Sequence, residues 1–165
     1  MSEAPRGDRD SQPGEDPRAS SAQQAPGGDS YTWYRRGLDL LGRGSPAAAA
    51  QLLERAAEAE PGARSVLEAL GRAQFDTGRY AQAADSFRQI VEASPSDDYA
   101  HFGLGLALAR SGDPAAAAEH LALAAAMRPE LRHYTEALRG VRATLRARAQ
   151  AAAPDPADPA SEQPS

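Results

Sequence analysis

The side chains of this sequence that could perform chemistry are three histidines and a scatter of carboxylates. His101, His120 and His133 are separated by 19 and 13 residues, so no two of them lie one helical turn apart as a zinc-binding pair on a helix would. The chain contains no cysteine, which removes disulfides, thiolate metal sites and cysteine nucleophiles. We therefore expect neither a metal site nor a catalytic residue.

The segment GLGLALARSG at 103–112 comes closest to a phosphate-binding loop, but it lacks the GK[ST] ending and a preceding strand. His101 is expected on the inward face of a helix, as a core residue with a satisfied ring nitrogen. The carboxylates on the expected helices, such as Glu54, Glu58 and Glu119, are interpreted as solvated surface charge. These features predict no cofactor and no enzymatic activity.

The composition separates a folded middle from two polar ends. The formal net charge is −5, and all 18 basic residues are arginine, a bias typical of a GC-rich bacterial genome. Residues 1–29 and 152–165 are rich in Pro, Ser, Asp and Gln, so they are expected to be disordered tails. The N-terminus has no apolar signal segment, and the longest apolar runs are too short to span a bilayer. We expect a soluble cytoplasmic protein.

The middle of the chain repeats itself with a period of 34 residues. Shifting the sequence by this period superposes two all-glycine columns and one all-proline column, which are strong signals, and three alanine columns, which are weak ones in an alanine-rich chain. The columns are Gly37, Gly71 and Gly105; Gly44, Gly78 and Gly112; Pro61, Pro95 and Pro129; Ala47, Ala81 and Ala115; Ala49, Ala83 and Ala117; and Ala50, Ala84 and Ala118.

Each unit is expected to form two helices of about 14 residues with short connections. The first helix ends at the second glycine of the unit, because glycine tolerates the positive φ of a helix terminus. Ser45 and Asp113 are the expected N-cap residues of the following helices, and each precedes a proline at the first helical position. The first glycine column and the alanine columns are expected at helix crossings, where small side chains allow close approach.

This pattern resembles the tetratricopeptide repeat, whose signature is W-x2-L-G-x2-Y, then A-x3-F, then P. The middle unit matches best, through Leu67, Leu70, Gly71, Gly78, Arg79, Tyr80, Ala83, Phe87 and Pro95. The resemblance implies an all-α, right-handed superhelical solenoid of helix-turn-helix hairpins that binds proteins or peptides. The expected boundaries are repeats at 30–63, 64–97 and 98–131, with a capping helix at 132–151.

The expected last helix, about Glu130 to Ala151, has one apolar stripe and a basic remainder. We interpret it as a cap that covers the exposed end of the solenoid. A basic helix is also compatible with nucleic-acid or membrane-surface contact, a less favoured alternative. The stripe contains Leu131, Tyr134, Leu138, Val141 and Leu145, and the basic residues are Arg132, Arg139, Arg142, Arg146 and Arg148.

The resemblance implies that the first helix of each unit lines a concave groove. At 100° per residue, a set of side chains about a quarter-turn from the Trp33–Gly37–Leu40 face should point into that groove. The same rings could instead pack between neighbouring first helices, and the sequence leaves this open. The predicted groove residues are Tyr31, Tyr34, Leu38, Leu41, Glu68, Arg72, Phe75, Asp76, Tyr99, Phe102, Leu106 and Arg110.

The leading hypothesis is an adaptor that holds a peptide or helix of a partner in this groove. Relatives that grip the C-terminal carboxylate of heat-shock chaperones do so with Lys, Arg and Asn, whereas the matching positions here are Tyr34, Leu38, Ala69, Tyr99 and Gly103. We therefore expect no chaperone-tail clamp. A self-associating structural protein is the alternative, although a monomer is favoured, and an RNA-binding helical repeat is a weaker one.

Overall fold

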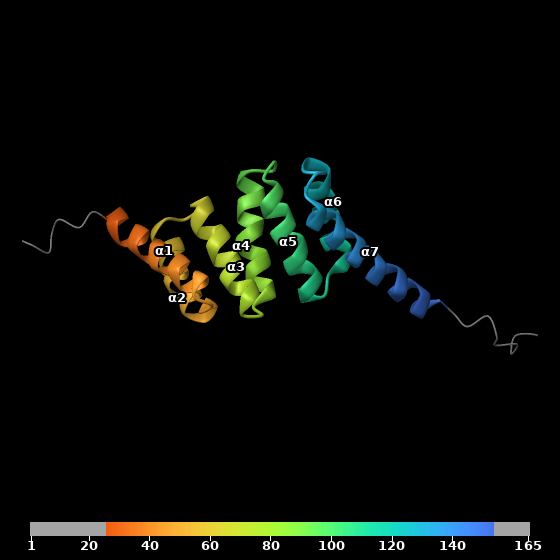
Figure 1. Cartoon of the computed structure of the whole chain (residues 1–165), viewed down its shortest axis with the longest axis horizontal. Coiled ribbons are helices and arrows are strands. Elements are labelled where there is room, and N and C mark those ends of the chain that lie inside the picture. The colour runs from red at the N-terminus through yellow and green to blue at the C-terminus, as the bar shows by residue number, and fades with distance from the viewer. Residues whose placement is uncertain (1–25, 154–165) are drawn as a thin grey trace, which may run out of the picture.

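The computed structural model describes residues 26–153, which form seven helices and, within that range, no strand. The predicted all-α fold is confirmed, and the helices follow one another along the long axis of the molecule (Figure 1). Neighbouring helices in the chain pack on each other, which gives three hairpins and a final single helix. The helices are α1 (Pro26–Gly42), α2 (Pro46–Ala59), α3 (Arg64–Asp76), α4 (Tyr80–Ala93), α5 (Asp98–Ser111), α6 (Pro114–Met127) and α7 (Arg132–Ala152).

The turn inside each hairpin has the predicted glycine. Gly44, Gly78 and Gly112 have φ angles of 73°, 77° and 102°, in the left-handed region that favours glycine. Asp113 caps α6 as expected, because its carboxylate accepts a hydrogen bond from the Ala116 amide at 3.0 Å. Ser45 is the N-cap residue of α2, as expected, but its side chain makes no cap hydrogen bond, so Pro46 at the first helical position favours the start of this helix.

The first glycine column lies where the two helices of a hairpin cross. A Cβ on Gly37 would lie 2.6 Å from Leu53 Cγ, and one on Gly105 would lie 2.6 Å from Leu121 Cγ. The column Ala49, Ala83 and Ala117 is completely buried beside these crossings. The column Ala47, Ala81 and Ala115 is exposed instead, so its predicted place at a crossing is wrong.

Helix α1 begins earlier than the sequence suggested. The expected boundary placed residues up to 29 in a disordered tail, but α1 starts at Pro26. Proline is favoured at a first helical position, and the buried Ser30 donates a hydrogen bond to the Glu60 carboxylate at the end of α2. A polar contact therefore anchors this turn, which a search for apolar residues could not detect. Residues 1–25 and 154–165 lie outside the described range.

Helix α7 covers α6, as a cap should. Leu138 and Val141 pack on Ala117 and Leu121 of α6, while Tyr134 is only 2% exposed. The Tyr134 hydroxyl donates a hydrogen bond to Asp98 at the start of α5, at 2.9 Å. The rest of α7 extends away from the stack at its C-terminal end (Figure 1).

Candidate functional site

A hollow between α3 and α5 contains half of the predicted groove residues. It has a volume of about 220 Å³, below the roughly 300–1,000 Å³ of small-molecule and cofactor sites. Its size therefore suits one bulky side chain and not a whole cofactor. We call it the central hollow; its lining residues are Arg72, Phe75, Asp76, Phe87, Tyr99, Phe102, Gly103 and Leu106.

The floor of the central hollow is the ring of Phe87, which α4 holds between two glycines. A Cβ on Gly71 of α3 would lie 2.8 Å from one edge of the ring, and a Cβ on Gly103 of α5 would lie 2.6 Å from the other. Phe87 is 3% exposed, and Tyr99 meets it edge-on with ring centroids 6.3 Å apart. Because glycine at positions 71 and 103 leaves room for it, the Phe87 ring packs against the first helices of two successive repeats.

Two opposite charges lie at the rim of the hollow. The sequence places Glu68 and Arg72 one helical turn apart, but Glu68 forms its ion pair with Arg64, at 2.7 Å. Arg72 and Asp76 are exposed, and neither forms an ion pair with another described residue. Both are available to a ligand without displacing an ion-pair partner among residues 26–153.

Tyr99 adds a hydroxyl group to this apolar space. Burial raises the pKa of Tyr99; the Arg72 charge opposes the rise, and the carboxylates of Glu68 and Asp76 add to it. The phenol is therefore protonated at neutral pH and can donate a hydrogen bond. Among residues 26–153 it has no hydrogen-bond partner, so the hollow combines apolar walls with a donor, a cation and an anion.

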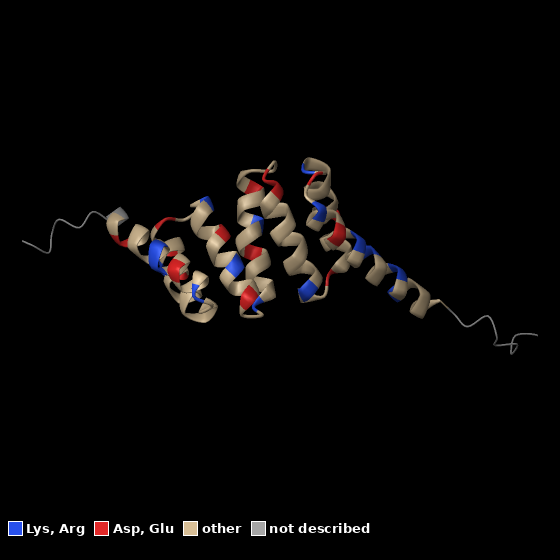
Figure 2. Cartoon of the chain, viewed as in Figure 1, with Lys and Arg blue, Asp and Glu red and all other residues tan. Residues whose placement is uncertain are grey.

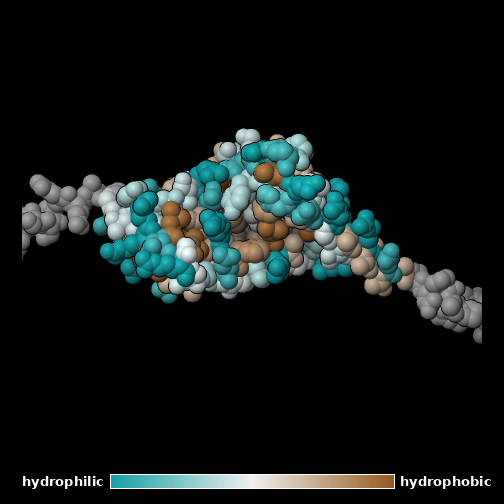
Figure 3. Space-filling model, viewed as in Figure 1, coloured by the Kyte–Doolittle hydropathy of each residue, from teal (hydrophilic) through white to brown (hydrophobic). Residues whose placement is uncertain are grey.

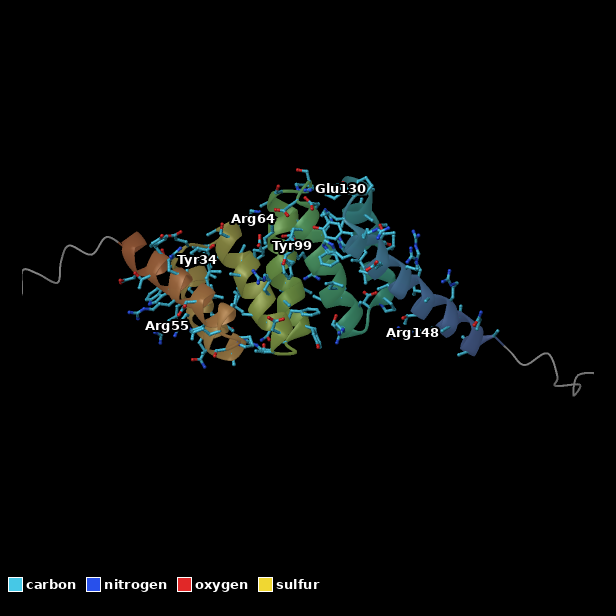
Figure 4. The ribbon with its side chains drawn as sticks, viewed as in Figure 1. Tyr34, Arg55, Arg64, Tyr99, Glu130 and Arg148 are labelled. Carbon is cyan, nitrogen blue, oxygen red and sulfur yellow. The ribbon has the colours of Figure 1, made fainter. Side chains whose placement is uncertain are left out.

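A second hollow lies between α1 and α3 and has a volume of about 270 Å³. Tyr31 and Tyr34 of the predicted set line it, and Tyr31 is 62% exposed. Tyr34 and Tyr99 lie on either side of α3, with Arg64 at the N-terminal end of that helix (Figure 4). We call this the N-terminal hollow; its lining residues are Ser30, Tyr31, Tyr34, Glu60, Ala63, Arg64, Ser65 and Val66.

Four predicted residues line neither hollow. Leu38 and Leu41 are half-buried and pack against the core of the first hairpin. Glu68 pairs with Arg64, as described above. The Arg110 guanidinium lies 5.8 Å from the Phe75 ring centroid and 5.7 Å from that of Tyr80, within the range of a cation–π contact. Arg110 therefore links α5 to the preceding hairpin.

Phe102 has both of the roles that the sequence left open. It lines the central hollow, and its ring also stacks on Tyr134 of α7 with a centroid separation of 4.5 Å. His133 meets the same ring edge-on at 5.2 Å. Because Phe102 holds α5 to α7, it is less suited than Leu106 to testing the hollow alone.

His101 is a core residue, as predicted, and the structure gives a hydrogen-bond partner to both of its ring nitrogens. It is 4% exposed, and its Nε2 lies 2.9 Å from the Pro95 carbonyl oxygen. That oxygen can only accept, so His101 carries a proton on Nε2, and its Nδ1 lies within hydrogen-bond distance of His120 Nδ1, 3.0 Å away. The described residues contain no group of three or more His, Cys, Asp or Glu that could hold a metal ion.

The sequence model of the tetratricopeptide repeat matches residues 34–98 and 69–132, which together span more than half of the chain. The chain belongs to the tetratricopeptide repeat family. No curated protein sequence matches it. No helix of residues 26–153 is long and apolar enough to cross a membrane.

Several solved structures share the fold. The first such domain of Spaghetti (RPAP3), bound to the HSP90 peptide SRMEEVD, has a TM-score of 0.67 and 17% identity, covering 71% of this chain and 93% of that one. MamA from Desulfovibrio magneticus RS-1 has a TM-score of 0.69 and 22% identity, covering 75% and 70%. The Yersinia enterocolitica secretion chaperone SycD, in complex with a YopD peptide, has a TM-score of 0.62 and 16% identity, covering 69% and 92%.

Proposed function

We propose that this protein is an interaction scaffold that binds an extended segment of a partner protein across the first helices of its repeats. The observation that supports the proposal is the central hollow, whose lining includes six residues of α3 and α5 from the set of twelve expected in a groove. A tetratricopeptide domain and a secretion chaperone of similar fold have been solved with bound peptides, which supports the same class of ligand here.

The chemistry of the hollow specifies the segment. Phe75, Phe102 and Leu106 suit one bulky apolar side chain, which would be the buried anchor of the interaction. Arg72, Asp76 and the Tyr99 hydroxyl suit polar groups of the residues on either side of that anchor. The positions that would form a carboxylate clamp include Ala69 and Gly103, so recognition here does not depend on a chaperone C-terminal carboxylate.

The test is selection of binding peptides from a random displayed library on the wild-type protein. Enriched peptides should share a bulky apolar residue and should lose binding to Leu106→Arg, which fills the hollow with charge. Leu123→Arg is the matched control, because Leu123 lies on the same hairpin outside both hollows and is 46% exposed.

Because Leu106 is half-buried and packs on the third hairpin, a thermal melt must accompany the Leu106→Arg result. Arg72→Glu provides a second variant at an exposed, unpaired position. It should alter which flanking residues are selected without changing the melting temperature. Selected peptides that bind the wild-type protein, Leu106→Arg and Arg72→Glu with equal affinity would refute the proposal.

Self-association is a second candidate function, supported by the outer face of α6. Arg55 of α2 and Gln89 of α4 align by the repeat with Leu123, whose side chain is apolar and exposed. The view in Figure 3 shows apolar patches separated by hydrophilic side chains on the surface. Light scattering separates the candidates: a particle larger than a monomer that Leu123→Arg dissociates would favour self-association.

A further inference from the structure

Helix α7 has the position of the first helix of a fourth hairpin. It packs on α6 and touches α5, just as α3 packs on α2 and touches α1. Its buried residues Tyr134, Leu138 and Val141 are shifted by one period of 34 from Ala100, Leu104 and Ala107, which are buried in α5. The face of α7 toward the preceding hairpin therefore follows the repeat.

The adjacent face of α7 departs from the repeat. The crossing position, occupied by Gly71 in α3 and Gly105 in α5, holds Arg139 in α7. The next position along this face, Leu108 in α5, holds Arg142. In the hairpins this face packs on the second helix of the unit, whereas both arginines of α7 are exposed. The described chain provides no second helix here.

This face concentrates positive charge that no described side chain pairs. Helix α7 contains five arginines and one glutamate, a net charge of +4, whereas the described residues before it have ten arginines against fourteen carboxylates, a net −4. Arginines run along α7 in Figure 2. Within residues 26–153, Arg132, Arg139, Arg142 and Arg146 form no ion pair and no hydrogen bond.

The face is also hollowed at its N-terminal end. Arg132, Thr135, Glu136 and Arg139 line a polar depression with Pro129, of about 370 Å³. Its one carboxylate, Glu136, forms no ion pair with another described residue, so neither Arg132 nor Arg139 is paired with it. A long polar side chain from a partner fits this depression better than an apolar one does.

We propose that an acidic helix of a partner protein docks along the Arg132–Arg139–Arg142–Arg146 face of α7, at the place of a missing second helix. Arg139 prevents the close crossing that glycine allows, so the partner helix lies farther out and meets the guanidinium groups with its carboxylates. Carboxylates spaced three and four residues apart lie on one face of a helix and match the arginine spacing. Arginine binds carboxylates in a bidentate geometry.

An acidic helix is favoured over a single-stranded nucleic acid because α7 offers few rings on which bases could stack. The described part of α7 presents no exposed aromatic side chain except His133 for base stacking. The interaction does not involve either hollow, so it is independent of the proposed peptide binding.

The test measures fluorescence anisotropy of a labelled, alanine-rich helical peptide with glutamates confined to one face. The wild-type protein should bind this peptide, and it should bind more weakly a peptide of identical composition with its glutamates distributed around the helix. The triple variant Arg139→Glu, Arg142→Glu and Arg146→Glu should weaken binding at least about tenfold, because each exposed ion pair contributes roughly two- to threefold.

The matched control reverses three other exposed arginines, Arg35, Arg36 and Arg55, which changes the net charge equally and should leave the affinity nearly unchanged. The corresponding glutamine triple variant of α7 removes the charge without reversing it and should show a smaller loss. Equal losses in the α7 and control variants would overturn the proposal, as would equal binding of the two peptides. Tighter binding of an RNA or DNA oligonucleotide would assign the face to phosphate, and no binding at about 50 mM salt would leave it a solvated cap only.

Discussion

The ring of Phe87 makes a sharp prediction about the stability of the second and third hairpins. In Gly103→Ala the new Cβ would lie 2.6 Å from two ring carbons, so the ring must move. It cannot move freely toward α3, because Gly71 leaves only the space of a missing side chain there. Such overpacking costs about 1–3 kcal/mol, while replacing a helical glycine by alanine returns about 0.5–1 kcal/mol. We expect the free energy of unfolding to fall by a net amount of about 1–2 kcal/mol.

Gly140→Ala is the matched control, because Gly140 also lies inside a helix and a Cβ there would meet nothing within 4 Å. The free energy of unfolding of this variant should rise by about 0.5–1 kcal/mol, which raises the melting temperature by a few degrees. Thermal and urea unfolding of both variants measure the contrast. Although the substitution is the same, we expect Gly103→Ala to lower the free energy of unfolding and Gly140→Ala to raise it.

A double-mutant cycle identifies the cause. Phe87→Leu removes the ring edge that the new methyl group would strike, so Gly103→Ala should be much less damaging in that background, with a coupling energy of at least about 0.5 kcal/mol. Equal stabilisation by Gly103→Ala and Gly140→Ala, or an additive cycle, would refute the reasoning that the two glycines hold the ring in place.

Phe102→Ala should lower the free energy of unfolding by about 1–3 kcal/mol, because it removes the stack on Tyr134; an unchanged melting temperature would show that the ring serves only the hollow. Stability should fall as the pH decreases below about 6.5, because burial and then the neighbouring His101 lower the pKa of His120, so that the unfolded chain binds more protons in that window. Melting temperatures from neutral to mildly acidic pH measure this fall, and His120→Gln should reduce it. Deleting residues 130–165 should produce an aggregating protein, since α7 covers apolar α6 side chains; a monodisperse, cooperatively unfolding fragment in light scattering would contradict this.

The fold was predictable because its determinants recur at a fixed spacing. Gly44, Gly78 and Gly112 share one backbone requirement, and Gly37 and Gly105 share one steric requirement, so a single period revealed both. The start of α1 was not predictable in this way. Ser30 is a polar residue, and its buried position is stabilised by a hydrogen bond to Glu60, thirty positions away, which no repeat period indicates.

The site was only partly predictable for a related reason. Helical periodicity indicates the direction of a side chain, and Phe75, Tyr99 and Leu106, which it assigned to one face, line one hollow. It does not indicate which charged neighbour a flexible side chain selects, so the pairing of Glu68 with Arg64 and the freedom of Arg72 required the structure. The double role of Phe102 likewise depends on where α7 lies, and α7 follows the last complete repeat.

The register of α7 also bears on how long such a protein can be. Because its inner face already follows the period, α7 departs from the repeat through its side chains and not through its backbone path. Replacing Arg139 by glycine and Arg142 by leucine, with a second helix appended after a Gly-containing turn, would convert the terminus into another module. Elongation by gene duplication or by design thus requires few substitutions, and reversing them would end the array at any chosen length.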